Sequence, residues 1–487
     1  MAGRSRRAAC ETVQMDDISG PEPLQRKWRA DEAQAGGRKL MRLRVYSRLG
    51  TRLRDMLHSL WFLPSLMVVL AVLLAVLTIR IDGMLRHSGP PRLLLFPGGV
   101  EGARSLLGGI ASSLFGVAGT VFTITITALS IASAQMGPRL MESFTRDWRN
   151  SVSLGTFLGT VAYTFTILRS VPSDSSQTDF IPHLGVYLAL LFTFISVIVL
   201  IYFIHHVATS INVGYVISSV HDDLCRTLLT QTVQGQRHDQ PHLLPPEWKE
   251  QDIVYAPRSG YLQSVDTDAL VHLAVSHGVT VCLLVRAGDF IMKDVPVAWV
   301  TPQACKGIPR TLTIGKTRTT NQDIEYAARK LVEVASRALS PAMNDPYTAM
   351  TVLDHLGDAL VSLQNRGLIN GQFEREGQVR LIMPQPEFSG LVETMFNMIR
   401  QYGRTHPSVM IRMLEVLTRS AAALVDPDRR SVLQTHADLV YKEALEHTEA
   451  QHDRDALERR YQRFVSVCND ARRLLDPGRP LPVQIHE

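Results

Sequence analysis

The segment between residues 116 and 134 is apolar over nearly the length of a bilayer core, yet one of its faces carries hydroxyl groups. Small and hydroxyl residues recur there at helical spacing, namely Gly116, Thr120, Thr123, Thr127, Ser130 and Ala134. A hydroxyl group in hydrocarbon costs free energy unless it finds a partner, so this face has to contact protein or line a water-filled path. The pattern predicts an integral membrane protein.

Three further segments are long and apolar enough to cross a membrane: residues 60–79, 154–168 together with 151–153, and 184–204. Each approaches or exceeds the roughly 17 to 20 residues that a bilayer requires, and none has a charged side chain in its middle. A tail of nearly 60 residues precedes the first segment, which is unlike a cleaved signal peptide. We therefore expect four transmembrane helices.

Basic residues are unevenly distributed between the connecting segments. A dense group directly precedes the first span, and another lies between the second and third spans at Arg139, Arg146 and Arg149, whereas the connection 169–183 contains Asp174 and Asp179. By the positive-inside rule, both termini are expected in the cytoplasm. The net charge of +5 is small and concentrated near the N-terminus, which indicates contact with the lipid bilayer and not with nucleic acid.

Composition divides the chain into five parts. Residues 1–40 have few large apolar groups and are expected to form a disordered basic tail, followed by an interfacial helix around 40–57. The transmembrane domain covers 41–220, and its last span is expected to continue as a helix towards His221. A small strand-rich module (221–310), a helical domain (311–475) and a tail (476–487) follow. The expected fold class is an α-helical membrane domain followed by a cytoplasmic α+β region, strand-rich first and helical at the C-terminus.

Local patterns locate elements within the C-terminal half. Short β-type runs at 252–256, 260–265, 279–285 and 295–300, with Phe290, predict strands, and 267–276 has helical composition. From Thr320 an apolar face at a period of 3.6 predicts a helix that ends at Pro341. A second helix is expected after Asn344, because Asp345 can cap it and Pro346 suits its first position.

Two stretches are more specific than these patterns. Residues 128–167 contain Gln135 and Pro138-Arg139, and residues 315–354 contain Gln322-Asp323 and the run ALSPAMNDPYTA at 338–349. Both resemble the signature regions of a bacterial predicted membrane protein family that is catalogued as a domain of unknown function, and the resemblance extends over about residues 49–440. It implies a multi-pass protein of the bacterial inner membrane and supplies no established activity or cofactor.

The hydroxyl face at 116–134 has two interpretations. It can line a pore, because hydroxyl groups replace part of the hydration shell of an ion. It can also pack tightly against the third span, where Gly155 and Gly159 recur with Ala162 and Thr166. The spans have no central carboxylate, which argues against a proton-coupled pump.

The corner at residues 340–348 is the main candidate for a metal site. Asp323, Asn344, Asp345 and Asp354 are oxygen ligands of the type that Mg²⁺ prefers, and Arg318 can bind an anion or pair with one of these carboxylates. The alternative is a turn in which these residues only end one helix and cap the next. His221, with Asp222 and Asp223, is expected on a solvated helix face, and the five cysteines show no metal or redox spacing.

Common catalytic templates are absent from the sequence, including the nucleophile elbow, the phosphate loop and the zinc-protease motif. We therefore assign no catalytic residue and no cofactor. The leading hypothesis is a channel-like or transport-related homo-oligomer with a cytoplasmic assembly or gating domain. The alternatives are a membrane-anchored scaffold or sensor for a partner or small ligand, and a metal-dependent enzyme built on the 340–348 corner.

Overall fold

The computed structural model describes residues 61–88, 97–137, 148–172, 181–210, 212–235, 252–302, 305, 307–424 and 426–473. The expected N-terminal tail (1–40), the interfacial helix (40–57) and the C-terminal tail (476–487) lie outside these residues.

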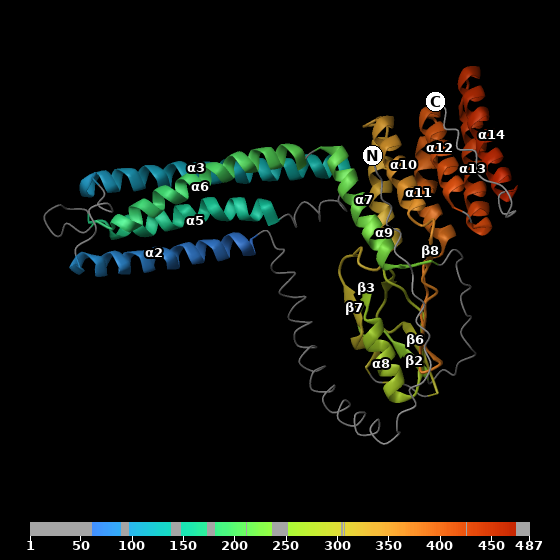
Figure 1. The fold of residues 1–487 in the computed structure, drawn as a ribbon, viewed down its shortest axis with the longest axis horizontal. Helices are drawn as coiled ribbons and strands as arrows, with labels where there is room; N and C mark the ends of the chain where they lie inside the picture. Colours follow the sequence, from blue (N-terminus) through green and yellow to red (C-terminus); the bar gives the residue numbers. More distant parts are fainter. Residues whose placement is uncertain are drawn as a thin grey trace, which may run out of the picture.

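Four long apolar helices form an elongated bundle beside the rest of the chain (Figure 1). They are α2 (Phe62–Ser88), α3 (Gly99–Met136), α5 (Trp148–Ser170) and α6 (His183–Ser210), and each is long and apolar enough to cross a membrane. Helix α5 is central, because 56% of its membrane-length segment is buried compared with 17 to 22% in the other three. The prediction of four spanning helices is confirmed.

Polar contacts and close packing join α5 and its neighbours. The hydroxyl groups of Thr160 on α5 and Ser196 on α6 lie 3.1 Å apart. At the end of the bundle away from the C-terminal region, Asp82 of α2 accepts hydrogen bonds from the first N–H groups of α6, at 3.1 Å from Leu184 and 3.0 Å from Gly185. A carboxylate at this position satisfies backbone donors that a helix N-terminus leaves open.

The fourth span does not continue as one helix towards His221. Helix α6 ends at Ser210, and α7 (Val213–Thr230) begins after Asn212, whose side-chain oxygen accepts a 2.9 Å hydrogen bond from the N–H of Gly214. The helical periodicity across this junction hid the break, because an N-cap residue interrupts the backbone and leaves the apolar spacing intact. Helix α7 leads from the bundle into the C-terminal region (Figure 1).

The strand-rich part contains two small sheets and one short ribbon. One sheet has the order β2-β6-β4-β10-β9 and the other β5-β3-β7, while β1 pairs with β8. The strands are β1 (Thr232–Gln234), β2 (Ile253–Tyr255), β3 (Gly260–Val265), β4 (Thr280–Leu283), β5 (Phe290–Ile291), β6 (Pro296–Thr301), β7 (Leu312–Gly315), β8 (Arg366–Leu368), β9 (Gln372–Arg375) and β10 (Gln378–Ile382), with α8 (Thr267–His277) and a short 3₁₀ turn η3 (Ile308–Arg310). The four β-type runs expected from sequence are present as β2, β3 and β4, and as β5 with β6 for the run that contains Phe290.

Strands β7 to β10 lie in the range expected to be helical. Strand β10 pairs in parallel with β4, placing Leu381 opposite Val281, so the first sheet is completed by a segment about 100 residues further along the chain. Both sheets contribute to one apolar core, to which β3 supplies Leu262 and β6 supplies Val297.

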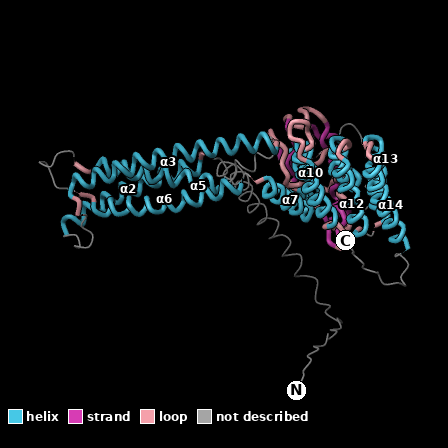
Figure 2. Tube along the Cα trace, turned by 90° about the horizontal axis from the view of Figure 1, so that it is seen from above, coloured by secondary structure: helices cyan, strands magenta, loops and turns pink. Residues whose placement is uncertain are grey.

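Six helices of the described chain form the remaining layer, where Figure 2 shows α10, α12, α13 and α14 together. They are α9 (Ile324–Ala338), α10 (Pro346–Val361), α11 (Phe388–Gly403), α12 (Pro407–Ala423), α13 (Pro427–His447) and α14 (Gln451–Arg473). Asp323 caps α9, and Asp345 caps α10 with Pro346 in its first turn. The cap of α10 is as predicted, whereas α9 begins at Ile324 and not at Thr320, because Asp323 is the residue that caps it. Helix α7 packs against α9 and α10 and shares their apolar core, so the chain leaving the membrane bundle is anchored in this layer.

Candidate functional site

The hydroxyl face of α3 points away from the bundle. Gly116, Thr120, Thr123, Thr127 and Ser130 are all exposed, and a side chain added at Gly116 would meet open space. The same stripe continues towards the start of α3 through Ser105, Gly109, Ser112 and Ser113. We call the exposed small and hydroxyl residues from Ser105 to Ala134 the α3 stripe.

The expected match between this stripe and the third span is wrong for the described residues. A side-chain atom added at Gly155 would lie 3.1 Å from Cα of Pro64, and one added at Gly159 would lie 3.6 Å from Cβ of Ala71, and both neighbours belong to α2. The glycines of α5 therefore allow close approach of α2 and leave the α3 stripe without a partner inside the described chain. Glycine spacing predicted a packing face but did not identify the helix that occupies it.

The outer surfaces of the other spans are of a different kind. Helix α2 exposes Leu70, Leu73 and Leu77, and α6 exposes Phe194 and Ile198, which are side chains suited to lipid. Helix α3 likewise exposes Phe115, Phe122 and Ile126 beside the stripe, whereas the stripe itself consists of small and hydroxyl residues whose hydroxyl groups are partly satisfied within the helix. Thr120 donates to the carbonyl of Gly116 at 3.1 Å and Thr123 to that of Gly119 at 3.0 Å. The stripe thus differs from the apolar surface that flanks it on the same helix.

Helix α3 extends beyond the bundle and contacts α9. Its 38 residues span about 57 Å, which exceeds the roughly 30 Å of a hydrocarbon core. Nη1 of Arg337 on α9 donates a 3.1 Å hydrogen bond to the carbonyl of Ala134 near the end of α3. A side chain at Gly137 would collide with Glu333 and Arg337, so the chain passes directly against α9. The helix that carries the stripe is thus joined to the C-terminal region.

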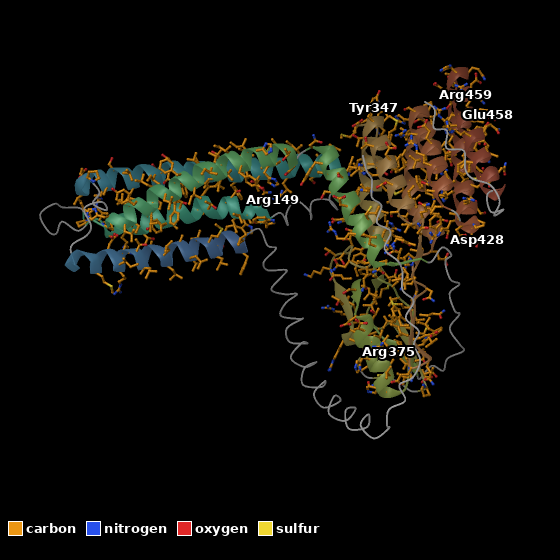
Figure 3. All side chains as sticks on the ribbon, viewed as in Figure 1. Arg149, Tyr347, Arg375, Asp428, Glu458 and Arg459 are labelled. Carbon is orange, nitrogen blue, oxygen red and sulfur yellow. The ribbon has the colours of Figure 1, made fainter. Side chains whose placement is uncertain are left out.

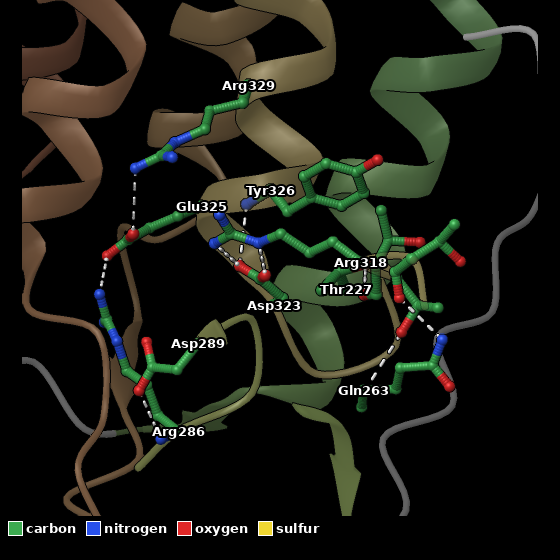
Figure 4. Close-up of polar contacts among 12 residues, drawn as sticks. Thr227, Gln263, Arg286, Asp289, Arg318, Asp323, Glu325, Tyr326 and Arg329 are labelled. Atoms are coloured by element: carbon green, nitrogen blue, oxygen red, sulfur yellow. Dashed lines mark hydrogen bonds and ion pairs between the residues drawn. The ribbon is translucent and has the colours of Figure 1, made fainter. Parts of the chain in front are cut away.

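The other end of α9 lies at the junction with the strand-rich part (Figure 4). The carboxylate of Asp323 accepts the backbone N–H of Tyr326 at 2.9 Å and pairs with Arg318, whose Nη2 lies 3.0 Å from Oδ1. Burial lowers the pKa of Arg318, but the hydrogen bond and charge of Asp323 outweigh it, so the pKa is raised above its usual value. Gly288 has a φ of +98°, and a side chain there would collide with this pair.

The segment before α9 is bound along β3 by its own side chains. Gln322 accepts from the N–H of Val265 at 2.9 Å and donates to its carbonyl at 3.1 Å, as a neighbouring strand would. The amide of Gln263 donates to the carbonyl of Thr317 at 2.8 Å, and Thr227 of α7 donates to that of Thr320 at 3.2 Å. The run of polar residues is therefore structural and joins β3, α7 and α9.

A cavity of about 220 Å³ opens at this junction and is lined by polar and apolar groups. Arg286, Asp323 and Glu325 contribute its charges, while Ile324, Ile369 and Phe373 are among its apolar residues. Nη2 of Arg286 lies 2.8 Å from Oε1 of Glu325, whose other oxygen lies 3.7 Å from Arg329. An anion entering the cavity would compete with Glu325 for Arg286. The sequence singled out Asp323 and Arg318 but missed Arg286 and Glu325, because the sheet pairing that brings them together is long-range.

The candidate metal ligands do not converge. Asp323 precedes α9 and Asp345 follows its C-terminal end, so a helix of 15 residues, about 22 Å long, lies between them. Asp345 caps α10 through the N–H of Thr348 at 3.1 Å, and Asn344 lies 3.1 Å from Nε2 of His406. Asp354 pairs with Arg412 at 2.8 Å. The capping interpretation accounts for the 340–348 corner, and the expectation of a shared metal site there is not supported by the geometry.

His221 also differs from its expected setting. It was expected on a solvated face of its helix, but it is 9% exposed and lies between α7 and α10, where its Nε2 is 3.0 Å from the carboxylate of Asp358. The sequence indicated only the adjacent Asp222 and Asp223, which are on the same helix.

Residues 57–419 match the family described as predicted membrane protein DUF2254. The chain belongs to this family. Over 366 residues, 72% of this chain, it is 33% identical to an uncharacterised protein of Mycobacterium bovis and equally to one of Mycobacterium tuberculosis, and the alignment covers 70% of each relative. No solved structure matches.

The DUF2254 match confirms the resemblance found in the sequence. It covers all four spanning helices, both sheets and α9 to α11, together with most of α12. The protein is thus a multi-pass membrane protein, and both the α3 stripe and the cavity beside Asp323 lie within the part that defines the family.

Proposed function

We propose that the protein is a channel-like homo-oligomer of the bacterial inner membrane, in which α3 stripes from several subunits line a shared path. The observation that carries the proposal is the exposure of the whole stripe, a row of small and hydroxyl residues flanked by exposed large apolar side chains of α3 and of the neighbouring spans. Four helices are too few to enclose a path alone, so the subunits have to supply the missing walls. Hydroxyl groups and glycines suit either a wet path or close contact between copies.

The proposed orientation places the C-terminal region and both termini in the cytoplasm. Arg149 lies at the end of α5 that faces the C-terminal region (Figure 3). By the positive-inside rule, the end of the bundle that carries basic residues is expected on the cytoplasmic side. The start of α2 and the end of α6 lie at the same end of the bundle (Figure 1). The C-terminal region is then on the side where a cytoplasmic ligand reaches the cavity at Arg286.

In this scheme α9 connects the cavity to the pore-lining helix. Asp323 and Glu325, at its first turn, line the cavity, and Arg337, in its last turn, contacts the end of α3. A ligand that displaces Glu325 from Arg286 would alter the position of α9 and hence of α3.

The cavity also favours a second function, that of a membrane-anchored sensor whose spans only hold it in place. Its mixture of paired charges and apolar walls suits a small anionic metabolite. Exchanging the four spans for an unrelated anchor separates the two proposals, because a sensor keeps its cellular role and a channel loses it.

The proposal is tested by K⁺ and Cl⁻ flux through the purified protein in liposomes under voltage, osmotic and pH challenge. The variant carries Thr123→Leu and Thr127→Leu on the stripe. Thr125→Leu is the matched control, because Thr125 lies on the opposite side of α3, is half-buried and donates to the carbonyl of Val121 at 2.8 Å. We expect flux in the wild type and control, and loss of flux in the stripe variant at unchanged oligomer size.

Two results would refute the channel. The first is a strictly monomeric protein in both mild detergent and nanodiscs. The second is flux that is absent from the wild type under every challenge, or equal in the wild type and the stripe variant.

A further inference from the structure

A cluster of unlike metal-ligand side chains lies between α7 and α10, outside the sites described so far. His221 and Cys225 are one helical turn apart on α7, and Asp358 faces them from α10. The ligand atoms of all three lie within 4.8 Å of one another. Residues four apart on a helix share a face, so the two α7 side chains present their ligand atoms together.

The three ligand atoms lie close enough together to share one ion. Nε2 of His221 lies 3.0 Å from Oδ2 of Asp358 and 3.3 Å from Sγ of Cys225. A tetrahedral zinc ion, with bonds of about 2.0 to 2.3 Å, holds its ligand atoms roughly 3.4 to 3.7 Å apart. The cluster therefore needs only small side-chain adjustments to surround such an ion.

A second imidazole lies beside the cluster. His355 precedes Asp358 by three residues on α10, and its ring centroid is 4.7 Å from that of His221. The cluster takes two side chains from α7 and one from α10, so the packing of these two helices fixes the separation of its ligand atoms. Asp358 is exposed, with 69% of its side chain open to solvent, so an ion can reach the cluster without opening the core.

From this convergence we infer that His221, Cys225 and Asp358, with His355 beside them, form a binding site for Zn²⁺. The mixed nitrogen, sulfur and oxygen set selects zinc over Mg²⁺ and Ca²⁺, which take oxygen ligands. The inference does not depend on permeation, since it concerns the helix that follows the last span.

The bound ion would join α7 to α10. Because α7 begins directly after α6, the metal would fix the segment that leaves the membrane onto the helical layer. Zinc would then control how firmly the membrane bundle is held by the C-terminal region.

The test uses the full-length protein, purified in mild detergent through a tag without histidines. Metal content is measured by mass spectrometry, and Zn²⁺ affinity by competition with a chromogenic chelator. Cobalt is substituted for zinc to detect thiolate-to-metal charge transfer in the near ultraviolet. The variants are Cys225→Ser and Asp358→Asn, and Cys282→Ser is the control, because Cys282 is buried in β4 away from the cluster.

We expect about one tightly bound Zn²⁺ per chain in the wild type and in Cys282→Ser. Both cluster variants should bind at least about tenfold more weakly, and Cys225→Ser should lose the cobalt charge-transfer band. Asp358→Asn alters an exposed side chain, so its effect cannot be ascribed to misfolding. Absence of tight Zn²⁺ binding to the wild type, or binding that both cluster variants retain, would overturn the inference.

Discussion

Replacing Asp323 by Asn separates two contributions that one carboxylate makes at the start of α9. Asparagine is as good an N-cap residue as aspartate, so the hydrogen bond from the N–H of Tyr326 is kept. The ion pair with Arg318 is lost, which leaves a guanidinium that is only 19% exposed without its carboxylate. The expected destabilisation therefore comes from the charge alone.

The magnitude follows from the burial of the pair. Breaking a fully buried ion pair costs about 3 to 5 kcal/mol. Because Arg318 keeps some contact with water and lies over the ring of Tyr326 at 5.3 Å, we expect about 2 to 3 kcal/mol for Asp323→Asn. Asp323→Ala also removes the cap and should cost about 1 kcal/mol more.

The assay is thermal unfolding of the purified protein in mild detergent at one fixed scan rate. For a region of about 200 residues, 2 to 3 kcal/mol corresponds to a midpoint lowered by about 4 to 12 °C. A double-mutant cycle with Arg318→Gln measures the coupling, which should be about 2 kcal/mol, so the double variant should be little less stable than either single variant.

Two outcomes would contradict this reasoning. If Asp323→Asn melts within about 1 °C of the wild type, the charge pair contributes nothing. If the two single effects add in the double variant, Arg318 and Asp323 act independently.

Three further predictions concern packing, pH and capping. Gly155→Val should lower the thermal midpoint by an amount equivalent to about 1 to 3 kcal/mol, because it forces α2 away from α5. The control Gly116→Val meets open space in the subunit and should leave the midpoint unchanged. Equal midpoints for the two variants would refute the assigned contacts. His436 is buried and close to Arg400, and burial followed by that charge lowers its pKa from 6.5 to about 4, so the neutral form is favoured in the folded state. The contribution of His436 to stability is thus fully present above about pH 6.5 and falls as the pH drops towards 4, by about 2 kcal/mol between pH 7 and pH 5. His436→Leu should flatten this part of a plot of melting midpoint against pH. An unchanged slope would contradict the role assigned to His436. Asp82→Ala should cost about 1 to 2 kcal/mol by removing the acceptor for two N–H groups of α6, measured by the same melts, and a neutral result would mean that water replaces the carboxylate.

Local signals in the sequence were sufficient for most elements. The cap of α10 by Asp345 follows from the preference of this residue for the N-cap position, and the four spans follow from length and hydropathy. The β-type runs likewise located β2 to β6. Each of these depends on neighbouring residues only.

Features that depend on distant residues were not accessible in this way. The parallel pairing of β10 with β4 joins Leu381 to Val281, and no periodicity within either strand specifies it. The convergence of Cys225 with Asp358 requires α7 to lie on α10, although the four-residue spacing from His221 to Cys225 was visible. For the same reason, the glycines of α5 indicated close helix packing but not the identity of the partner helix.

The length of α3 has a mechanical consequence. A helix that runs unbroken for 38 residues is a stiff rod with one end against α9 and the other at the far end of the bundle. If such a rod of about 57 Å pivots by 5° at α9, its distant end moves by about 5 Å. A displacement of that size is comparable to the diameter of an ion with one water, so in the proposed channel a much smaller movement where Arg337 contacts α3 would open or close a narrow path.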